Sequence, residues 1–167
     1  METLNTSTRT CRDFSTLFGN EMKDMFRYAC YKIGNAEDAE DLLQDMYLTL
    51  YSKLKTGMDI CNMRNYLYRC LTNTCTDYLR KKQSMKIVSI ENANALCSPE
   101  TENFEQEYRK INTLLSAIPD EQAEVIRMRI HSDRSFAEIA EILETPVSTV
   151  KSRFQYGIEK IKKGLAN

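Results

Sequence analysis

The sequence predicts an all-α fold made of two small helical domains joined by a flexible linker. The 167 residues include only 5 Gly and 3 Pro, so few residues interrupt helices. Apolar residues recur at helical spacing along most of the chain, and no segment shows the alternation of a half-buried strand. A hydrophobic share of 42% and a charged share of 28% are typical of globular proteins, which excludes collagen-like and fully disordered chains.

The first half of the chain contains three predicted helices, at about residues 11–33, 35–57 and 62–82. Gly34 suits the left-handed backbone that ends a helix, and Asn35 is a favoured N-cap for the next helix. The predicted apolar face of the first helix is Phe14, Leu17, Phe18, Met22, Met25, Phe26 and Ala29, and that of the second is Leu42, Leu43, Met46, Leu50 and Leu54.

The third predicted helix has an unusual polar side. Its apolar side is Leu67, Cys70, Leu71, Thr74, Cys75 and Tyr78, and its polar side is Asn65, Arg69, Asn73, Thr76 and Arg80. Solvated helix faces usually carry Glu, Lys and Gln, whereas Asn and Thr are mediocre helix formers. Their short polar groups suit hydrogen bonding to a ligand, so we expect this side to take part in recognition.

The second half begins after residues 84–102, which lose helical periodicity and contain Ser98-Pro99. We interpret this stretch as an interdomain linker. A helix is predicted at about residues 103–117, and another starts at Pro119 with acidic residues in its first turn.

Two capping patterns place the last two helices. Ser135 and Glu138 form a predicted capping box for a short helix that ends near Leu143. Thr145 and Pro146 suit the N-cap and the first helical position of the final helix. This helix is predicted to bury Val147, Val150, Phe154, Ile158 and Ile161. The tight connection between the two helices indicates a helix-turn-helix.

In a helix-turn-helix the second helix enters the major groove of DNA by its N-terminal part. The residues opposite its buried side are Ser148, Thr149, Lys151, Ser152, Gln155 and Tyr156, flanked by Arg153. Hydroxyls and cations at this place suit phosphates, and Lys151, Ser152 and Gln155 could reach base edges. The alternative is a basic amphipathic helix packed in a bundle.

Charge is balanced overall, at a net charge of -1, but is segregated along the chain. Residues 35–48 and 100–124 are acidic, whereas residues 62–86 and 151–163 are basic. Two basic surfaces could hold nucleic acid at two places while the acidic ones face a basic protein partner. Ordinary solvated helix faces are the alternative interpretation.

The sequence offers no catalytic constellation. His131 is the only histidine, and no two of the 6 cysteines have C-x-x-C spacing, so we expect no metal site and no cofactor. The first ten residues form no signal-peptide core, and no apolar run reaches the roughly 18 residues of a membrane span. We therefore expect a cytoplasmic chain without membrane insertion, whose cysteines are reduced and semi-buried.

Five motifs follow one another along the chain: Asp38-Ala-Glu-Asp-Leu-Leu-Gln-Asp45, Tyr66-Leu-Tyr-Arg69 leading to Asn73 and Asp77-Tyr-Leu-Arg-Lys81, Ile118-Pro-Asp-Glu-Gln122, Phe136-Ala-Glu-Ile-Ala140 and Thr149-Val-Lys-Ser-Arg153. Together they closely resemble the extracytoplasmic-function group of bacterial RNA polymerase sigma factors, over about residues 13–164. Each motif alone is weak, whereas five in the same order make the resemblance strong.

The resemblance implies a region-two domain at residues 11–83, a linker at 84–102 and a region-four helix-turn-helix domain at 103–165. In the family, the first domain binds the clamp helices of the polymerase largest subunit and the minus-ten promoter element. The second binds the flap of the other large subunit and the minus-thirty-five element. Such a protein binds core RNA polymerase, directs it to specific promoter DNA and helps to open that DNA without ATP. Factors of this group are commonly held inactive by an anti-sigma factor.

The resemblance also assigns roles to residues. The polymerase contact is Asp41, Gln44 and Asp45. The minus-ten contacts are Tyr66 and Asn73 for unstacked bases, near the loop 55–62, and Arg69, Arg80, Lys81 and Lys82 for phosphates. The minus-thirty-five contacts are Ser148, Thr149, Lys151, Ser152, Arg153, Gln155 and Tyr156.

The chain departs from the family pattern at three places. Tyr66 stands where Trp is usual, and Glu144 replaces a common turn Gly and must adopt that backbone with a Cβ present. The segment 155–157 also differs from the usual residues, which leaves the preferred promoter sequence open.

A stand-alone helix-turn-helix transcriptional regulator is the second hypothesis, and it predicts a dimer that binds DNA without polymerase. An enzyme is a remote third.

Overall fold

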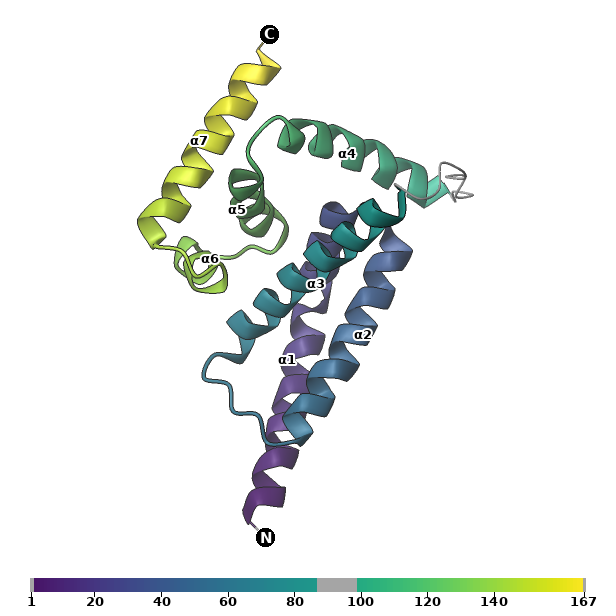
Figure 1. Cartoon of the computed structure of the whole chain (residues 1–167), viewed down its shortest axis with the longest axis vertical. Helices are drawn as coiled ribbons and strands as arrows, with labels where there is room; N and C mark the ends of the chain where they lie inside the picture. The colour runs from purple at the N-terminus through teal and green to yellow at the C-terminus, as the bar shows by residue number, and fades with distance from the viewer. Residues whose placement is uncertain (1, 87–98, 167) are drawn as a thin grey trace. The chain divides into compact units, whose positions relative to one another are not determined.

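The computed structural model of the protein describes residues 2–86 and 99–166, and this part of the chain is built of α-helices without a strand (Figure 1). The helices are α1 (Glu2–Ile33), α2 (Ala36–Lys55), α3 (Met63–Lys86), α4 (Pro99–Ser116), α5 (Asp120–His131), α6 (Phe136–Ile142) and α7 (Val147–Leu165). The predicted all-α class is confirmed. The chain divides into two compact units, residues 1–76 and 77–167, and the division falls within α3.

In the first unit, α1 and α2 run antiparallel and pack against each other, and the N-terminal end of α1 extends beyond α2 (Figure 1). The turn between them forms as predicted. Gly34 has φ of 79°, and the Asn35 side chain accepts a hydrogen bond of 2.9 Å from the Asp38 amide. All five predicted apolar residues of α2 are buried, as are Phe14, Phe18, Met25 and Ala29 of α1. Leu17, Met22 and Phe26 are half-buried.

The largest side chains of this core include Tyr28 and Tyr68, which the helical pattern did not single out. Both are almost fully buried, at 0% and 1% exposure. Asn65 was predicted to lie on the polar side of α3, and this is wrong, because it is only 4% exposed. Residues 65, 68 and 72 share a stripe at helical spacing. The burial of Tyr68 therefore carries Asn65 into the interior with it.

Three predicted helix ends are also wrong. Helix α1 begins at Glu2, not at about Cys11, because adding residues to an existing helix costs little compared with starting one. The predicted linker at 84–102 is helical at both ends, since α3 continues to Lys86 and α4 begins at Pro99. The Ser84 hydroxyl donates to the Arg80 carbonyl over 3.0 Å, and proline is tolerated in a first helical turn. The rest of the predicted linker, residues 87–98, lies outside the described residues.

The second unit packs α5 and α7 around a small apolar core. Buried Leu115, Ile118, Ala123 and Ile126 form its centre, and Ile111, Phe154, Ile158 and Ile161 pack against it half-buried. Val150 is fully buried as predicted. Val147 was predicted to be buried as well, but it is 40% exposed, because it is the first residue of α7, at an open helix end.

The helix-turn-helix connection follows the predicted capping in part. The capping box of α6 is confirmed, with the Glu138 amide donating to Ser135 Oγ over 3.2 Å and the Ser135 amide donating to the Glu138 carboxylate over 2.8 Å. Glu144 has φ of 52°, so it adopts the left-handed turn despite its Cβ. The N-cap of α7 is Pro146, not Thr145, because Pro146 has an extended ψ of 141° and the Thr145 hydroxyl donates to the Leu143 carbonyl.

Gly157 is buried where α7 crosses α5. A Cβ at this position would lie 2.7 Å from Ile126 Cδ1, 3.3 Å from Gln122 Cβ and 3.4 Å from Ile118 Cδ1. The two helices therefore approach more closely than a side chain on α7 would allow.

We expect Gly157→Ala to lower the free energy of unfolding by about 1 kcal/mol. Overpacking a filled core costs about 2 kcal/mol, and the higher helix propensity of Ala returns about 1 kcal/mol of it. Urea unfolding of the whole chain, followed by circular dichroism, measures the change. Gly164→Ala is the matched control in the same helix, because no atom lies within 4 Å of its Cβ position. Equal stability of the two variants would show that Ile126 moves aside without cost.

Candidate functional site

The acidic face of α2 consists of Asp41, Gln44 and Asp45, all of them exposed. These residues alternate with the buried Leu43 and Met46, so they point away from the packing surface against α1. The face can therefore meet a basic partner without any rearrangement of the core.

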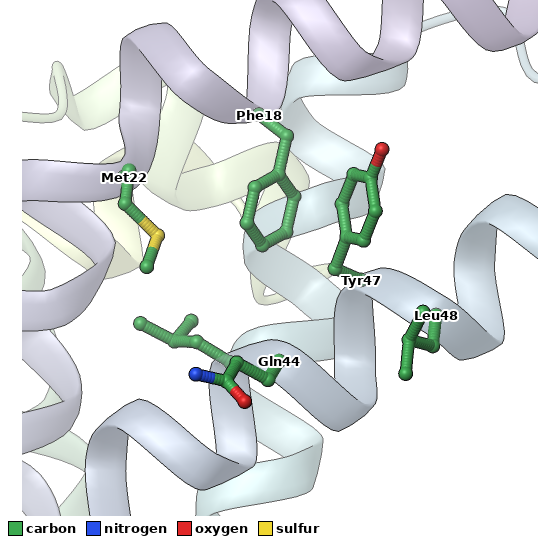
Figure 2. Close-up of a pocket in the computed structure, with 6 residues that line it drawn as sticks. Phe18, Met22, Gln44, Tyr47 and Leu48 are labelled. Atoms are coloured by element: carbon green, nitrogen blue, oxygen red, sulfur yellow. The ribbon is translucent and has the colours of Figure 1, made fainter.

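Beside the acidic face lies an apolar groove between α1 and α2, with a volume of about 360 Å³. We call it the α1–α2 groove. It is lined by Phe18, Met22, Leu43, Gln44, Tyr47 and Leu48. Figure 2 shows Phe18 and Met22 extending from α1 toward Gln44 and Tyr47 of α2. The Phe18 and Tyr47 rings meet edge to face at 5.0 Å, which holds one wall of the groove in place.

The sequence pattern missed this groove. Its clearest sign is Leu48, which lies off the buried stripe of α2 and is 64% exposed. Gln44 belongs both to the groove lining and to the acidic face, so the two features form one continuous surface. A leucine exposed beside carboxylates suits a partner that brings an apolar side chain together with cations.

The loop 56–62 leads into α3 and contacts it through Tyr66. The Tyr66 hydroxyl lies 4.0 Å from Met58 Sδ, and Met58 is itself 39% exposed. Burial raises the pKa of Tyr66, and the neighbouring Cys70 adds to this effect, so the phenol stays protonated and can donate a hydrogen bond. The half-buried Tyr66 ring and the Met58 thioether offer an apolar surface at the start of α3.

Farther along α3, the structure distinguishes Asn73 from the threonines around it. The hydroxyls of Thr72, Thr74 and Thr76 each donate to the carbonyl four residues earlier, over 2.9, 2.7 and 2.8 Å. Asn73 is exposed, and its amide can both donate and accept. On this stretch of α3, Asn73 is therefore the residue best suited to read a polar ligand.

The cations of α3 differ in their surroundings. Arg80 pairs with Asp77 at 3.2 Å, and the Lys82 ammonium lies 3.3 Å from the Tyr78 hydroxyl. Lys81 is exposed and Arg69 is half-buried. Because the Asp77 pair is exposed, it is easily exchanged for a phosphate.

The helix-turn-helix presents its predicted residues as a separate surface on α7. Ser148, Lys151, Ser152, Gln155 and Tyr156 are exposed, while Thr149 is half-buried. The Ser152 hydroxyl donates to the Ser148 carbonyl over 2.9 Å, so the long exposed side chains of this surface are Lys151, Gln155 and Tyr156.

Arg153 stands apart from this surface. Its guanidinium pairs with Glu121 in the first turn of α5 at 2.6 Å, and its side chain is only 25% exposed. The sequence grouped Arg153 with the phosphate contacts, whereas in the structure it also ties α7 to α5.

A buried arginine fixes the turn that precedes α6. Arg134 is 2% exposed, its Nε donates to the Ser132 carbonyl over 2.8 Å, and its own carbonyl accepts from Arg129 over 2.9 Å. The Arg129 guanidinium lies 5.2 Å from the centre of the Phe136 ring, which in turn packs edge to face on Phe154. This chain of contacts connects α5 to α6 and α6 to α7.

The cysteines form no assembled site in the described part of the chain, where no group of His, Cys, Asp and Glu could hold a metal ion. Cys11, Cys30 and Cys75 are buried and Cys70 is half-buried, whereas Cys61 is exposed, which corrects the prediction for that residue. Cys97 lies outside the described residues. None of the described helices is both long and apolar enough to cross a membrane.

Two family models match the chain in order. The model described as Sigma-70 region 2 matches residues 17–85, and the model described as Sigma-70, region 4 matches residues 108–161. The first match contains the acidic face of α2 and the polar side of α3, and the second contains the helix-turn-helix.

Curated relatives match most of the chain. The ECF RNA polymerase sigma factor SigW of Bacillus subtilis is 29% identical over 163 residues, covering 86% of this chain and 84% of its own. RNA polymerase sigma factor SigV of the same species is 23% identical over 147 residues, covering 88% and 87%. The ECF RNA polymerase sigma-E factor of Escherichia coli is 28% identical over 129 residues, covering 70% and 68%.

Two solved structures share the fold. One is CnrH in complex with the cytosolic domain of CnrY, with a TM-score of 0.72 and 17% identity, covering 99% of this chain and 98% of that one. The other is the sigma factor RpoE in complex with the anti-sigma factor NepR from Bartonella quintana, with a TM-score of 0.67 and 21% identity, covering 93% and 98%.

Proposed function

The chain belongs to the sigma-70 family and is an RNA polymerase sigma factor of the extracytoplasmic-function group, and we propose that its two helical domains divide the work of promoter recognition. In this proposal residues 11–83 bind core polymerase and the minus-ten element, residues 84–102 connect the domains, and residues 103–165 bind the minus-thirty-five element. The match of both sigma-70 regions, in order, on one chain is the observation that carries it.

The same observation separates this function from the second hypothesis. A stand-alone helix-turn-helix regulator needs only the part of the chain that matches region 4, and it leaves the region 2 match at residues 17–85 without a role. The family regulates transcription initiation, and we propose that this chain acts in the cytoplasm by binding alone, without chemistry of its own.

The direct test adds the purified chain to core RNA polymerase on fragments of bacterial genomic DNA and maps the transcript starts. We expect defined starts that appear only when both proteins are present and that require no ATP hydrolysis for opening. DNA binding by the chain alone, as a dimer and with no change in polymerase starts, would instead support the regulator.

Core polymerase binds, in our proposal, across the acidic face of α2 and the α1–α2 groove. Asp41, Gln44 and Asp45 are exposed beside the apolar lining, so a basic helix of the clamp can pair with the carboxylates while one of its apolar side chains enters the groove. The charges then set the encounter rate and the register, and the groove contributes desolvated contact area.

We expect Asp41→Lys to weaken the binding of core polymerase roughly tenfold or more, and Gln44→Ala to weaken it less, without unfolding the chain. Both side chains are exposed, so little packing is lost. A pull-down with core enzyme measures binding, and circular dichroism measures folding. Glu107→Lys, the same charge reversal at an exposed position of α4, is the control. Undiminished binding by Asp41→Lys would remove the acidic face from the polymerase contact.

The start of α3, Asn73 and the cations of the same helix bind the minus-ten element in our proposal. Tyr66 and Met58 offer a surface on which an unstacked base can pack, and Asn73 offers an amide for its polar edge. Arg69, Arg80, Lys81 and Lys82 hold the phosphates of the same strand.

We expect Asn73→Ala to reduce promoter opening about tenfold or more while core binding stays unchanged. The flipped base loses one hydrogen-bond partner, which costs about 1–3 kcal/mol. Permanganate footprinting of the melted region supplies the measurement. Thr76→Ala is the matched control, because Thr76 is exposed on the same helix but its hydroxyl donates to the Thr72 carbonyl. If both variants open the promoter normally, Asn73 has no role in reading the element.

The exposed side of α7 binds the minus-thirty-five element in our proposal. The contacts are Ser148, Thr149, Lys151, Ser152, Arg153, Gln155 and Tyr156. Lys151 and Arg153 hold phosphates, and Gln155 faces the base edges together with Ser152, whose hydroxyl donates to the Ser148 carbonyl and therefore meets a base as an acceptor. Because the Arg153 guanidinium is paired with Glu121, it has to contact the phosphate while it remains bound to that carboxylate.

We expect Lys151→Ala to weaken binding to all minus-thirty-five sequences about equally and to reduce the salt slope by about one unit. Gln155→Ala is expected to change which sequence is preferred and to leave the slope intact. Competition between promoter variants for the holoenzyme, at several salt concentrations, measures both properties. A changed preference with an unchanged slope for Lys151→Ala would reverse the two assignments.

We also propose that an anti-sigma factor holds the chain inactive. Support comes from the fold shared with RpoE, whose solved structure contains the anti-sigma factor NepR. Purification of the chain from its own cells at low salt tests this, and a chain recovered only with core polymerase would contradict it.

A further inference from the structure

A buried carboxylate joins α1 to the start of α3. Glu21 is 6% exposed, yet its two carboxylate oxygens contact two residues of α3. Oε1 lies 2.7 Å from Nε of Arg64, and Oε2 accepts a hydrogen bond of 2.8 Å from the Tyr68 hydroxyl. Arg64 and Tyr68 are one helical turn apart, so a single side chain of α1 holds the first two turns of α3.

The charge of Glu21 suits this end of α3. The first turn of α3 contains no acidic residue and carries Arg64 instead, which adds a cation to the positive end of the helix dipole. The Glu21 carboxylate supplies the missing negative charge from another helix. It also gives Arg64 a partner, although the Arg64 side chain is 45% exposed and would remain hydrated without one.

Burying a carboxylate is a poor way to gain stability, because its desolvation cancels much of the attraction that it makes. What the contact adds is a defined orientation of α3 relative to α1. Two short charge-assisted bonds fix the rotation of α3 about its axis and its position along α1, whereas apolar contacts alone tolerate sliding. Tyr66 lies between the two anchored residues, and Arg69 follows the second, so both project from the anchored part of the helix.

We propose that Glu21, through Arg64 and Tyr68, is a positioning residue for promoter opening, which sets the angle at which α3 and the loop 56–62 meet the melted strand. This inference rests on the proposed minus-ten role of α3. The proposed polymerase surface does not include the contact, because the acidic face lies on α2 and Glu21 is not among the residues that line the α1–α2 groove. Loss of the contact therefore affects opening and leaves core binding unchanged.

The test compares Glu21→Gln, Arg64→Gln and the double variant in the holoenzyme. Promoter opening is measured by permanganate footprinting, core binding by pull-down and folding by thermal unfolding. We expect each single variant to reduce opening roughly tenfold, the double variant to be no worse than the worse single one, and core binding to stay at the wild-type level. Glu159→Gln, which removes the charge of an exposed carboxylate paired with Lys163, is the control and opens normally.

If either single variant fails to fold, the double variant keeps the test decisive, because it leaves no buried carboxylate without its cation. Normal opening by Arg64→Gln, or a loss of opening that only follows a loss of folded protein, would overturn the proposal. Asn73→Ala in the same assay distinguishes a failure of the positioning role of Glu21 from a failure of the minus-ten role of α3. If Asn73→Ala is impaired while the Glu21 and Arg64 variants are normal, only the positioning role fails. If Asn73→Ala is normal, the minus-ten role of α3 and this inference fail together.

Discussion

The first unit depends on side-chain hydrogen bonds that tie α3 to α1. We propose that α3 reads a melted strand, and a helix with this role needs a polar outer side, so less of its surface remains for apolar packing. In this protein the tie has two parts. Glu21 binds the first two turns of α3, and farther along the Lys32 ammonium of α1 donates to the Thr72 carbonyl over 3.3 Å. Directional bonds at both places define one position of α3, which apolar contacts alone would leave less defined.

Helix α1 thereby contributes to both proposed binding surfaces of the unit, the α1–α2 groove and the polar side of α3. Phe18 and Met22 line the α1–α2 groove, and Glu21, within the same turn, reaches α3. In the second unit, two turns and one close helix contact orient the helices. The capping box at Ser135, the left-handed Glu144 and the close approach at Gly157 set α6 and α7 against α5. In both units buried neighbours determine the orientation of the helix, and therefore which of its residues are exposed.

The sequence could predict what is local. Helical spacing identified the five buried residues of α2, and short motifs identified the Asn35 cap and the Ser135 capping box, because these depend on residues within one turn. It could not predict that Tyr68 brings Asn65 into the core, or that Arg153 pairs with Glu121. Both depend on a partner helix far away in the chain. The α1–α2 groove was missed for the same reason, since an exposed Leu48 becomes meaningful only beside Phe18 and Met22.

The central claim is that α3 and α7 read two promoter elements within one polymerase complex. A photo-crosslinking amino acid placed at position 73 or at position 155 of the chain, assembled with core polymerase on a promoter, tests it most directly. The account predicts crosslinks from position 73 to the non-template strand of the minus-ten element and from position 155 to the minus-thirty-five duplex. Crosslinks from position 73 to polymerase alone, or from both positions to one element, would contradict it.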